Sequence, residues 1–285
     1  MSVPAAYLGV IIIWSTTPLA IKWSSETGIM FGVSGRMLLG ASLCLLIITL
    51  LRVDFPWHRA ARRSYLAASI SIYGALMVTY WGAQFISSGL IAVLFGTAPI
   101  VTSLLTIILL GERQISWNKW AGMLLGVIGL GLIFNSELSI GTESIKGLLA
   151  VLLAVILHSF SAVWIKRMNV SLSPLAITSG GLLVALPLYG ITWIMLGESL
   201  PTSISTRSML SIIYLGIFGS VLGFIFYYYI LKHLDAKRVA LITLITPISA
   251  LFLGQNLNGE IIQATIWLGA CIVLGGLGLY QWGKS

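Results

Sequence analysis

Ten long apolar segments, separated by short polar or charged stretches, dominate this sequence. A helix needs about 20 mostly apolar residues to cross the hydrocarbon core of a bilayer, and each segment is close to that length. The strand alternation of a transmembrane barrel is absent, and a backbone in lipid must satisfy its own hydrogen bonds. We therefore predict an all-α integral membrane protein with ten transmembrane helices, over residues 4–22, 29–51, 65–86, 89–110, 117–134, 147–165, 174–196, 208–231, 238–257 and 263–282.

The composition excludes a soluble globular protein. Only 8% of the residues are charged, 58% are hydrophobic, and the mean hydropathy is +1.01, whereas soluble domains carry roughly 25% charged residues. The first segment lacks a basic leader and a small-residue cleavage site, so we expect it to remain as helix one. Cys44 and Cys271 lie inside apolar segments, where small packing residues are expected rather than a disulfide or a metal site.

The basic residues are unevenly distributed between the two faces of the predicted bundle. One face carries Lys22, Lys146 and Arg207. The other carries Arg52, Arg59, Arg62, Arg63, Arg113, Lys119, Lys166, Arg167, Lys232, Lys237, Arg238 and Lys284. Basic loops stay in the cytoplasm, so both termini are predicted to be cytoplasmic. The net charge of +8 therefore sets the orientation, and no nucleic-acid partner is expected.

An internal repeat divides the chain into two units. The stretch Tyr80–Glu112 aligns without a gap on Tyr228–Glu260, and identical residues include the Tyr, Pro and Gly-Glu positions. After a one-residue slip, Trp120 and its glycines recur at Trp267 and beyond. We predict two five-helix repeats, at 1–135 and 147–285. An odd number of spans per repeat inverts the second copy relative to the first.

Two features of the first two helices are candidates for function. Helix one has a polar block at mid-span, from Trp14 to Pro18. The block predicts either a kink alone or a kink that also lines a cavity, and Thr17 is a candidate binding residue. Helix two carries Arg36, which we interpret first as reaching the outer interface. Binding of a substrate carboxylate is the alternative.

Helix three places Tyr73, Met77, Tyr80 and Gln84 on one stripe. Such a stripe is usually packing, but the hydroxyl groups need partners, which favours a wet interior. Helix four has Pro99, and helix nine has Thr246 and Pro247. Each Gly-Glu pair is predicted to end one helix and to place its carboxylate at the start of the next. The glycines of 117–134 and 263–282 predict close helix packing.

Helix six carries His158, the one titratable side chain near the middle of any span, followed by Ser161. Aligning helix six with helix one places His158 opposite Trp14. A buried neutral histidine that bonds to a neighbour and a residue of the transport pathway are the two interpretations.

These residues resemble a known family. The Trp-Ser block in helix one, the two five-helix halves and the proline followed thirteen residues later by Gly-Glu are similar to EamA-type members of the drug/metabolite transporter (DMT) superfamily, and most similar to the YddG type of bacterial aromatic amino-acid exporters. The resemblance implies an inverted repeat around a central cavity. Carried over residue by residue, it implies a cavity that draws on Trp14, Tyr80, Pro99, His158, Tyr228 and Pro247.

The predicted function is a secondary exporter of small metabolites, aromatic or other bulky neutral amino acids, in the inner (plasma) membrane. No carboxylate lies at mid-membrane, so facilitated diffusion by alternating access around a central cavity is the first hypothesis and proton exchange through His158 the second. The alternative function is a proton-coupled exporter of other metabolites or drugs. The chain has no P-loop, no HExxH helix and no carboxylate cluster, which disfavours an ATP pump and an intramembrane lipid-modifying enzyme. A non-transporting scaffold is a further alternative. We expect no enzymatic activity, no cofactor, no metal, and a monomer or weak homo-oligomer in the lipid bilayer.

Overall fold

A computed structural model describes residues 2–111, 117–234 and 236–282 of the chain. Within these ranges, side chains at 139–140, 224, 228, 231–232, 236–241 and 282 are outside the description. The described part contains helices and connecting turns, and no strand. The elements are α1 (Val3–Ser24), α2 (Ile29–Leu51), α3 (Arg59–Ser69), η1 (Ile70–Ala75), α4 (Leu76–Gly82), α5 (Ser88–Gly96), α6 (Ala98–Leu110), α7 (Trp117–Ile140), α8 (Thr142–Met168), α9 (Pro174–Met195), α10 (Thr206–Tyr214), η2 (Leu215–Leu222), α11 (Gly223–His233), α12 (Ala236–Asn258) and α13 (Ala264–Trp282).

Eight stretches of the described chain are helices long and apolar enough to cross a membrane. They are Val3–Ser24, Ile29–Leu51, Ser88–Leu110, Trp117–Leu138, Thr142–Met168, Pro174–Met195, Thr206–Tyr227 and Ala264–Gln281. The remaining two predicted segments are also helical, as α3–η1–α4 and as α12. The described part of the structure is thus all-helical with eight candidate membrane spans, as a membrane protein requires, and the count of ten spans stays a prediction.

Two of the helical stretches contain a turn of π-helix, which sequence reasoning did not predict. The segment η1 joins α3 to α4, and η2 joins α10 to α11. In η2 the Gly223 amide donates to the Phe218 carbonyl five residues earlier. A π-helical turn is rare, widens the helix locally and occurs often at functional sites.

Two predicted boundaries are wrong, and a third predicted segment keeps its bounds but is interrupted. The segment predicted as one helix over 89–110 is divided at Thr97, because Pro99 has no amide hydrogen and the Thr97 amide and hydroxyl both donate to the Leu94 carbonyl, at 3.0 and 2.6 Å. The helix predicted over 65–86 begins at Arg59, where His58 caps it by accepting from the Ala61 amide, and ends at Gly82. The loop predicted before helix six is reduced to Gly141, since α7 ends at Ile140 and α8 begins at Thr142.

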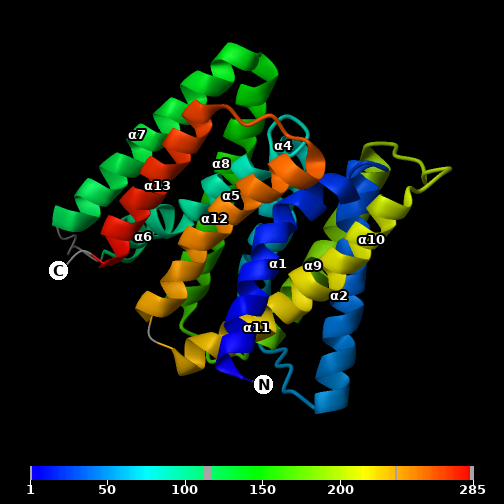
Figure 1. Cartoon of the computed structure of the whole chain (residues 1–285). Helices are drawn as coiled ribbons and strands as arrows, with labels where there is room; N and C mark the ends of the chain where they lie inside the picture. Colours follow the sequence, from blue (N-terminus) through cyan, green and yellow to red (C-terminus); the bar gives the residue numbers. More distant parts are fainter. Residues whose placement is uncertain (1, 112–116, 235, 283–285) are drawn as a thin grey trace.

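Helices from the two sequence halves pack against each other throughout the bundle. Helix α1 lies between α12 and the α10–η2–α11 stretch, and α8 contacts α3, η1 and α4 (Figure 1). The predicted packing of the glycine-rich helices is confirmed: a Cβ at Gly122 would lie 2.5 Å from the Gly276 carbonyl, so α7 and α13 approach at backbone contact. One large apolar cluster joins both halves and includes Met37, Tyr80, Leu148 and Leu215.

Candidate functional site

Aromatic and hydroxyl side chains gather where α1 meets η2 and α11. The rings of Trp14 and Tyr227 lie 5.0 Å apart between centroids. The hydroxyls of Thr16 and Tyr214 are 2.6 Å apart, and the Tyr214 ring stacks on Phe218 at 5.2 Å. Because Trp14 and Thr16 belong to the first half and their partners to the second, this cluster spans the two halves.

The polar block around Pro18 is partly used within α1 itself. The Thr17 hydroxyl donates to the Ile13 carbonyl at 2.7 Å, and the Thr16 hydroxyl donates to the Ile12 carbonyl at 2.7 Å. Pro18 has no amide hydrogen, so the carbonyl that loses its backbone donor is that of Trp14, whereas the two threonine hydroxyls bond to the carbonyls one and two residues before it. The helix runs through Pro18 without a break. The Thr17 hydroxyl is thus bonded within α1, while Trp14 and Thr16 also reach the second half.

A second cross-half cluster forms where α8 meets η1 and α5. His158 Nδ1 lies 2.8 Å from the Ser71 hydroxyl, and the Phe95 ring stands edge-on to the imidazole at 6.0 Å. The His158 side chain is exposed even though its contacts come from helices inside the bundle. Ser161, one turn further, is only 2% exposed and donates to the Ala67 carbonyl at 2.7 Å. Ser161 therefore ties α8 to α3, and His158 faces accessible space.

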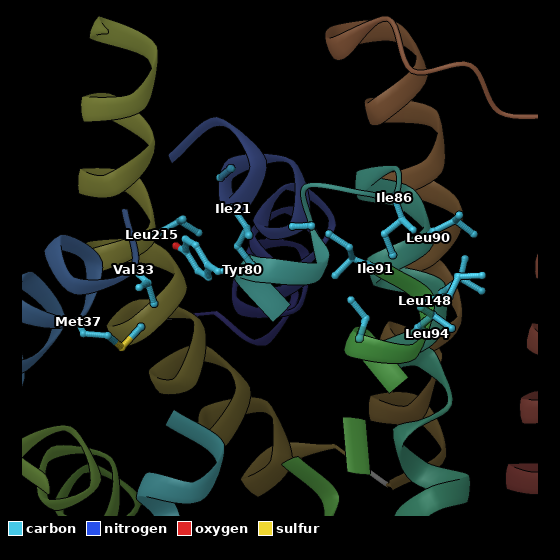
Figure 2. Packing of buried hydrophobic residues seen from close by; sticks show 14 of the residues in the cluster. Ile21, Val33, Met37, Tyr80, Ile86, Leu90, Ile91, Leu94, Leu148 and Leu215 are labelled. Atoms are coloured by element: carbon cyan, nitrogen blue, oxygen red, sulfur yellow. The ribbon is translucent and has the colours of Figure 1, made fainter. Parts of the chain in front are cut away.

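The two tyrosines of the predicted stripe in helix three are separated in the structure. The Tyr73 hydroxyl lies 2.6 Å from the Thr192 hydroxyl, and its ring stands edge-on to Tyr189 at 5.0 Å. Tyr80 has no exposed surface and accepts from the Ser24 hydroxyl at 3.2 Å. Figure 2 shows the Tyr80 ring close to Leu215 of η2 and to Ile21 of α1. Tyr80 is thus a packing residue in this conformation.

The two prolines of the repeat meet different backbones. Pro99 lies in the first turn of α6, just after the break at Thr97, whereas Pro247 lies inside the continuous helix α12. Helices α5 and α12 cross here, because a Cβ at Gly96 would lie 3.5 Å from the Pro247 ring. Thr246 is buried beside Pro247. Tyr228 lies in α11, and its side chain is outside the described part of the structure.

The described members of the predicted set thus fall into separate clusters. Trp14 and His158, which the repeat alignment pairs, have different neighbours, Tyr227 for the first and Ser71 with Phe95 for the second. The Trp14 cluster includes Phe218 of η2 and Tyr227 of α11, the helix that continues η2. The His158 cluster includes Ser71 of η1. Aromatic rings with a hydroxyl group nearby are the kinds of side chain that line binding sites for aromatic or amphipathic molecules.

A polar network at the C-terminal end of α1 was missed from the sequence. The Glu260 side chain is 7% exposed, and its carboxylate accepts hydrogen bonds from the backbone amide and the hydroxyl of Ser88, at 2.9 Å each. It also accepts from the side-chain amide of Asn258 at 2.9 Å. Lys22 Nζ lies 3.5 Å from the same carboxylate and donates to the Ile86 carbonyl at 2.9 Å. We call Lys22, Ser88, Asn258 and Glu260 the end network. It joins α1 and α5 to the loop that follows α12.

The end network corrects one prediction. Gly111 and Gly259 both follow a helix end, with φ of +72° and +62°, as predicted. The carboxylate of Glu260, however, does not meet the start of α13, which begins at Ala264; it meets the N-terminus of α5 in the other half. A helix N-terminus favours a carboxylate whichever chain segment supplies it. Glu112 lies outside the described residues.

Two depressions lie beside α1. A polar one of about 480 Å³ adjoins the end network and is lined by Lys22, Glu26 and Gln84, among others. An apolar one of about 530 Å³ lies between α1 and α12, with Ile12, Ser15 and Phe252 in its wall. Neither is lined by a residue of the predicted site. The apolar depression is lined by Ser15 and Thr16 of the polar block in helix one, for which lining a cavity was one of the two interpretations. The sequence gives no signal for the polar depression, because its wall is made by residues that only the packing brings together.

Arg36 does not reach the interface. Its side chain is 5% exposed, and Nε donates to the Ser220 hydroxyl of η2 at 3.2 Å. The preferred prediction for this residue is therefore wrong, and the guanidinium lies inside the bundle.

The chain was compared with known proteins. The sequence profile of the EamA-like transporter family matches residues 3–135 and 145–281. An uncharacterized transporter of Buchnera aphidicola (Schizaphis graminum) is 28% identical, over 94% of this chain and 89% of its own length. The uncharacterized inner membrane transporter YedA of Escherichia coli K12 is 25% identical over 98% of this chain and 90% of its own length. Protein PagO of Salmonella typhimurium is 24% identical over 92% of this chain and 87% of its own length.

The fold has also been observed before. The crystal structure of another protein superposes on this chain with a TM-score of 0.67, covering 98% of this chain and 96% of that chain at 16% identity. At this identity the likeness concerns the fold alone. The two profile matches together span nearly the whole sequence, and the chain therefore belongs to the EamA-like transporter family.

Proposed function

We propose that this protein is a secondary transporter that exports small metabolites, aromatic or other bulky neutral amino acids, through the inner membrane by facilitated diffusion. The observation that carries the proposal is His158, which is exposed while its partners Ser71 and Phe95 come from η1 and α5. Ionisable side chains within transmembrane segments usually face the bundle interior or a water-filled cavity, so we infer a polar space beside this imidazole. Such a space in a membrane protein marks a substrate pathway.

Further observations support alternating access. The profile matches the chain twice, at 3–135 and 145–281, as two repeats would require. The clusters at Trp14 and at His158 both join a helix of one half to a π-helical stretch of the other. Rocking of one half against the other would open and close these contacts. We infer that the end network closes the bundle at the C-terminal end of α1, the end that the distribution of basic residues predicts to lie outside.

The aromatic rings and hydroxyls support an amino acid with an apolar side chain. At the α1 junction, Trp14 pairs with Tyr227, Tyr214 pairs with Phe218, and Thr16 contributes a hydroxyl. The separate cluster on α8 contributes the His158 imidazole beside the Phe95 ring. Aromatic pairing and hydrogen bonds to a few polar atoms fix the orientation of such ligands. The resemblance to YddG-type exporters agrees with this substrate class, and the name of the Escherichia coli relative supports the inner membrane.

The test is uptake of labelled tryptophan, phenylalanine, threonine and glutamate into liposomes that contain the purified protein, with and without an imposed pH gradient. We expect selective, gradient-independent uptake of the aromatic amino acids. Absence of uptake for every amino acid would refute the amino-acid assignment. Gradient-driven uptake that is lost in His158→Ala, but kept in the matched control His233→Ala on α11, would instead establish proton exchange through His158.

A further inference from the structure

Arg36 occupies the face of α2 that turns into the bundle. Val33, Arg36, Met37 and Gly40 recur at helical spacing and are all buried. Figure 2 shows Val33 and Met37, on either side of Arg36 in sequence, directed toward Tyr80 and Leu215. Arg36 Nε donates to the Ser220 hydroxyl at 3.2 Å, while Nη1 has no hydrogen-bond partner and almost no exposed surface.

The positive charge of Arg36 has no carboxylate partner among the residues that the structure describes. The ion pairs there join Lys22 to Glu260, Lys146 to Glu143 and Arg207 to Glu26. A buried charge without a counter-charge costs several kcal/mol, and arginines inside membrane proteins mark substrate or ion pathways. The cost of keeping Arg36 unpaired indicates that an anion completes the site at another stage of the protein's cycle.

The surroundings of the guanidinium suit an anion with several acceptor atoms. A Cβ at Gly219 would lie 3.3 Å from Nη2, so the guanidinium rests against the backbone of the π-helical segment η2. Guanidinium groups bind carboxylates through two parallel hydrogen bonds, and Nη1 is the nitrogen left without a partner for such a ligand.

We propose that Arg36, held in place by Ser220, binds the carboxylate of the transported molecule. The inference rests on the proposed function and deepens it: the substrates are carboxylic acids, and the carboxylate enters when the contact between α2 and η2 opens. Ser220 acts as a positioning residue, because its hydroxyl fixes Nε and leaves Nη1 for the ligand.

The first measurement needs no variant. Thermal unfolding of the purified full-length protein is followed with tryptophan, with indole-3-propionate, which keeps the carboxylate and lacks the amine, and with tryptamine, which keeps the amine and lacks the carboxylate. We expect both acids to stabilise the protein at concentrations roughly tenfold or more below tryptamine, as charge-assisted bonds imply. Equal stabilisation by tryptamine, or none by either acid, would overturn the proposal.

The second measurement assigns the effect to Arg36. Competition with labelled tryptophan uptake is compared for the wild type, Arg36→Met, Arg36→Lys and Ser220→Ala, with Arg207→Met as the matched control of a surface arginine. We expect Arg36→Met to lose the preference for acids over tryptamine, Arg36→Lys to restore part of it, and Arg207→Met to retain it. A full preference in a folded Arg36→Met would refute the assignment.

Two failures remain distinguishable. A wild type that takes up tryptophan but is inhibited equally by tryptamine and indole-3-propionate keeps the proposed function and loses the carboxylate site. A wild type that takes up no amino acid, but is stabilised by indole-3-propionate and not by tryptamine, loses the amino-acid assignment and keeps the carboxylate site. Addition of inorganic phosphate separates a general anion site from a carboxylate site, since equal stabilisation by phosphate would contradict the latter.

Discussion

The contact between α2 and η2 has a counterpart in the contact between α9 and the α3–η1 stretch. In each, the second helix of one half crosses the π-helical segment of the other half. Arg36 is the eighth residue of α2, and Gly181 is the eighth residue of α9. The same crossing is therefore made once with a buried arginine and once with a glycine.

The glycine version is closely packed and apolar. A Cβ at Gly180 would overlap the Tyr65 ring, and a Cβ at Gly181 would lie 2.7 Å from Ile72 and 2.8 Å from Ala68. Its polar contact is neutral, since the Tyr189 hydroxyl donates to the Ile72 carbonyl of η1 at 2.7 Å. The α9 crossing packs without a charged residue, so helix packing alone does not explain why α2 carries a buried arginine at the matching position. We attribute the charge of Arg36 to the ligand that the α2–η2 contact binds.

The largest effect on stability is expected from disrupting the glycine-containing contact of α9 with the α3–η1 stretch. Gly180→Leu forces a side chain into the Tyr65 ring, and overpacking of this kind costs about 3 kcal/mol of unfolding free energy. Chemical denaturation in detergent measures the loss. Gly190→Leu on the same helix is the control, because a Cβ there meets nothing within 4 Å. Equal stability of the two variants would show that α9 and α3 are not in close contact.

A smaller effect is expected from the neutral hydrogen bond of the glycine version. Tyr189→Phe leaves the Ile72 carbonyl of η1 without its side-chain donor, which costs about 1 kcal/mol. Thermal unfolding measures the change. Tyr73→Phe serves as the comparison, because the Thr192 hydroxyl that it leaves still donates to the Leu188 carbonyl at 2.9 Å. If Tyr73→Phe proves the more harmful of the two, Tyr189 does not support the π-helical turn.

The smallest effect on stability is expected at Arg36 itself. Arg36→Met replaces an unpaired buried charge with an apolar side chain of similar length, so the unfolding free energy should change by less than about 1 kcal/mol or rise. Lys22→Met is the contrast, because it removes the cation that faces the Glu260 carboxylate and should cost about 1–2 kcal/mol. A severe loss of stability in Arg36→Met alone would make Arg36 a structural residue and would weaken the comparison.

Several features of the candidate site could be read from the sequence. His158 stands out as a titratable residue in an apolar stretch, and the structure finds it exposed beside Ser71 and Phe95. Trp14, the first residue of the polar block in helix one, was implied by the family resemblance, and it meets Tyr227 of the other half. The roles of Ser161 and Tyr80 were less predictable, because a hydroxyl in a helix bonds to whichever backbone or side chain lies next to it. Here these partners are Ala67 and Ser24.

By itself, the sequence determined the class of the protein and its helical segments. The hydrophobic effect and the need to satisfy backbone hydrogen bonds in lipid act locally, so runs of apolar residues suffice to predict membrane helices, and Gly111 and Gly259 suffice to predict where two of them end. The glycine-rich pattern also predicted the close packing of α7 on α13.

The tertiary structure decided which helix each functional group serves. The sequence suggested that Glu260 meets the helix that follows it and that Arg36 turns outward, yet Glu260 caps α5 and Arg36 reaches η2, both in the opposite half. The π-helical turns η1 and η2 also appear only in the folded protein. The physical reason is that a polar group in an apolar bundle must find its partner in three dimensions, and partners from the other half are distant in sequence.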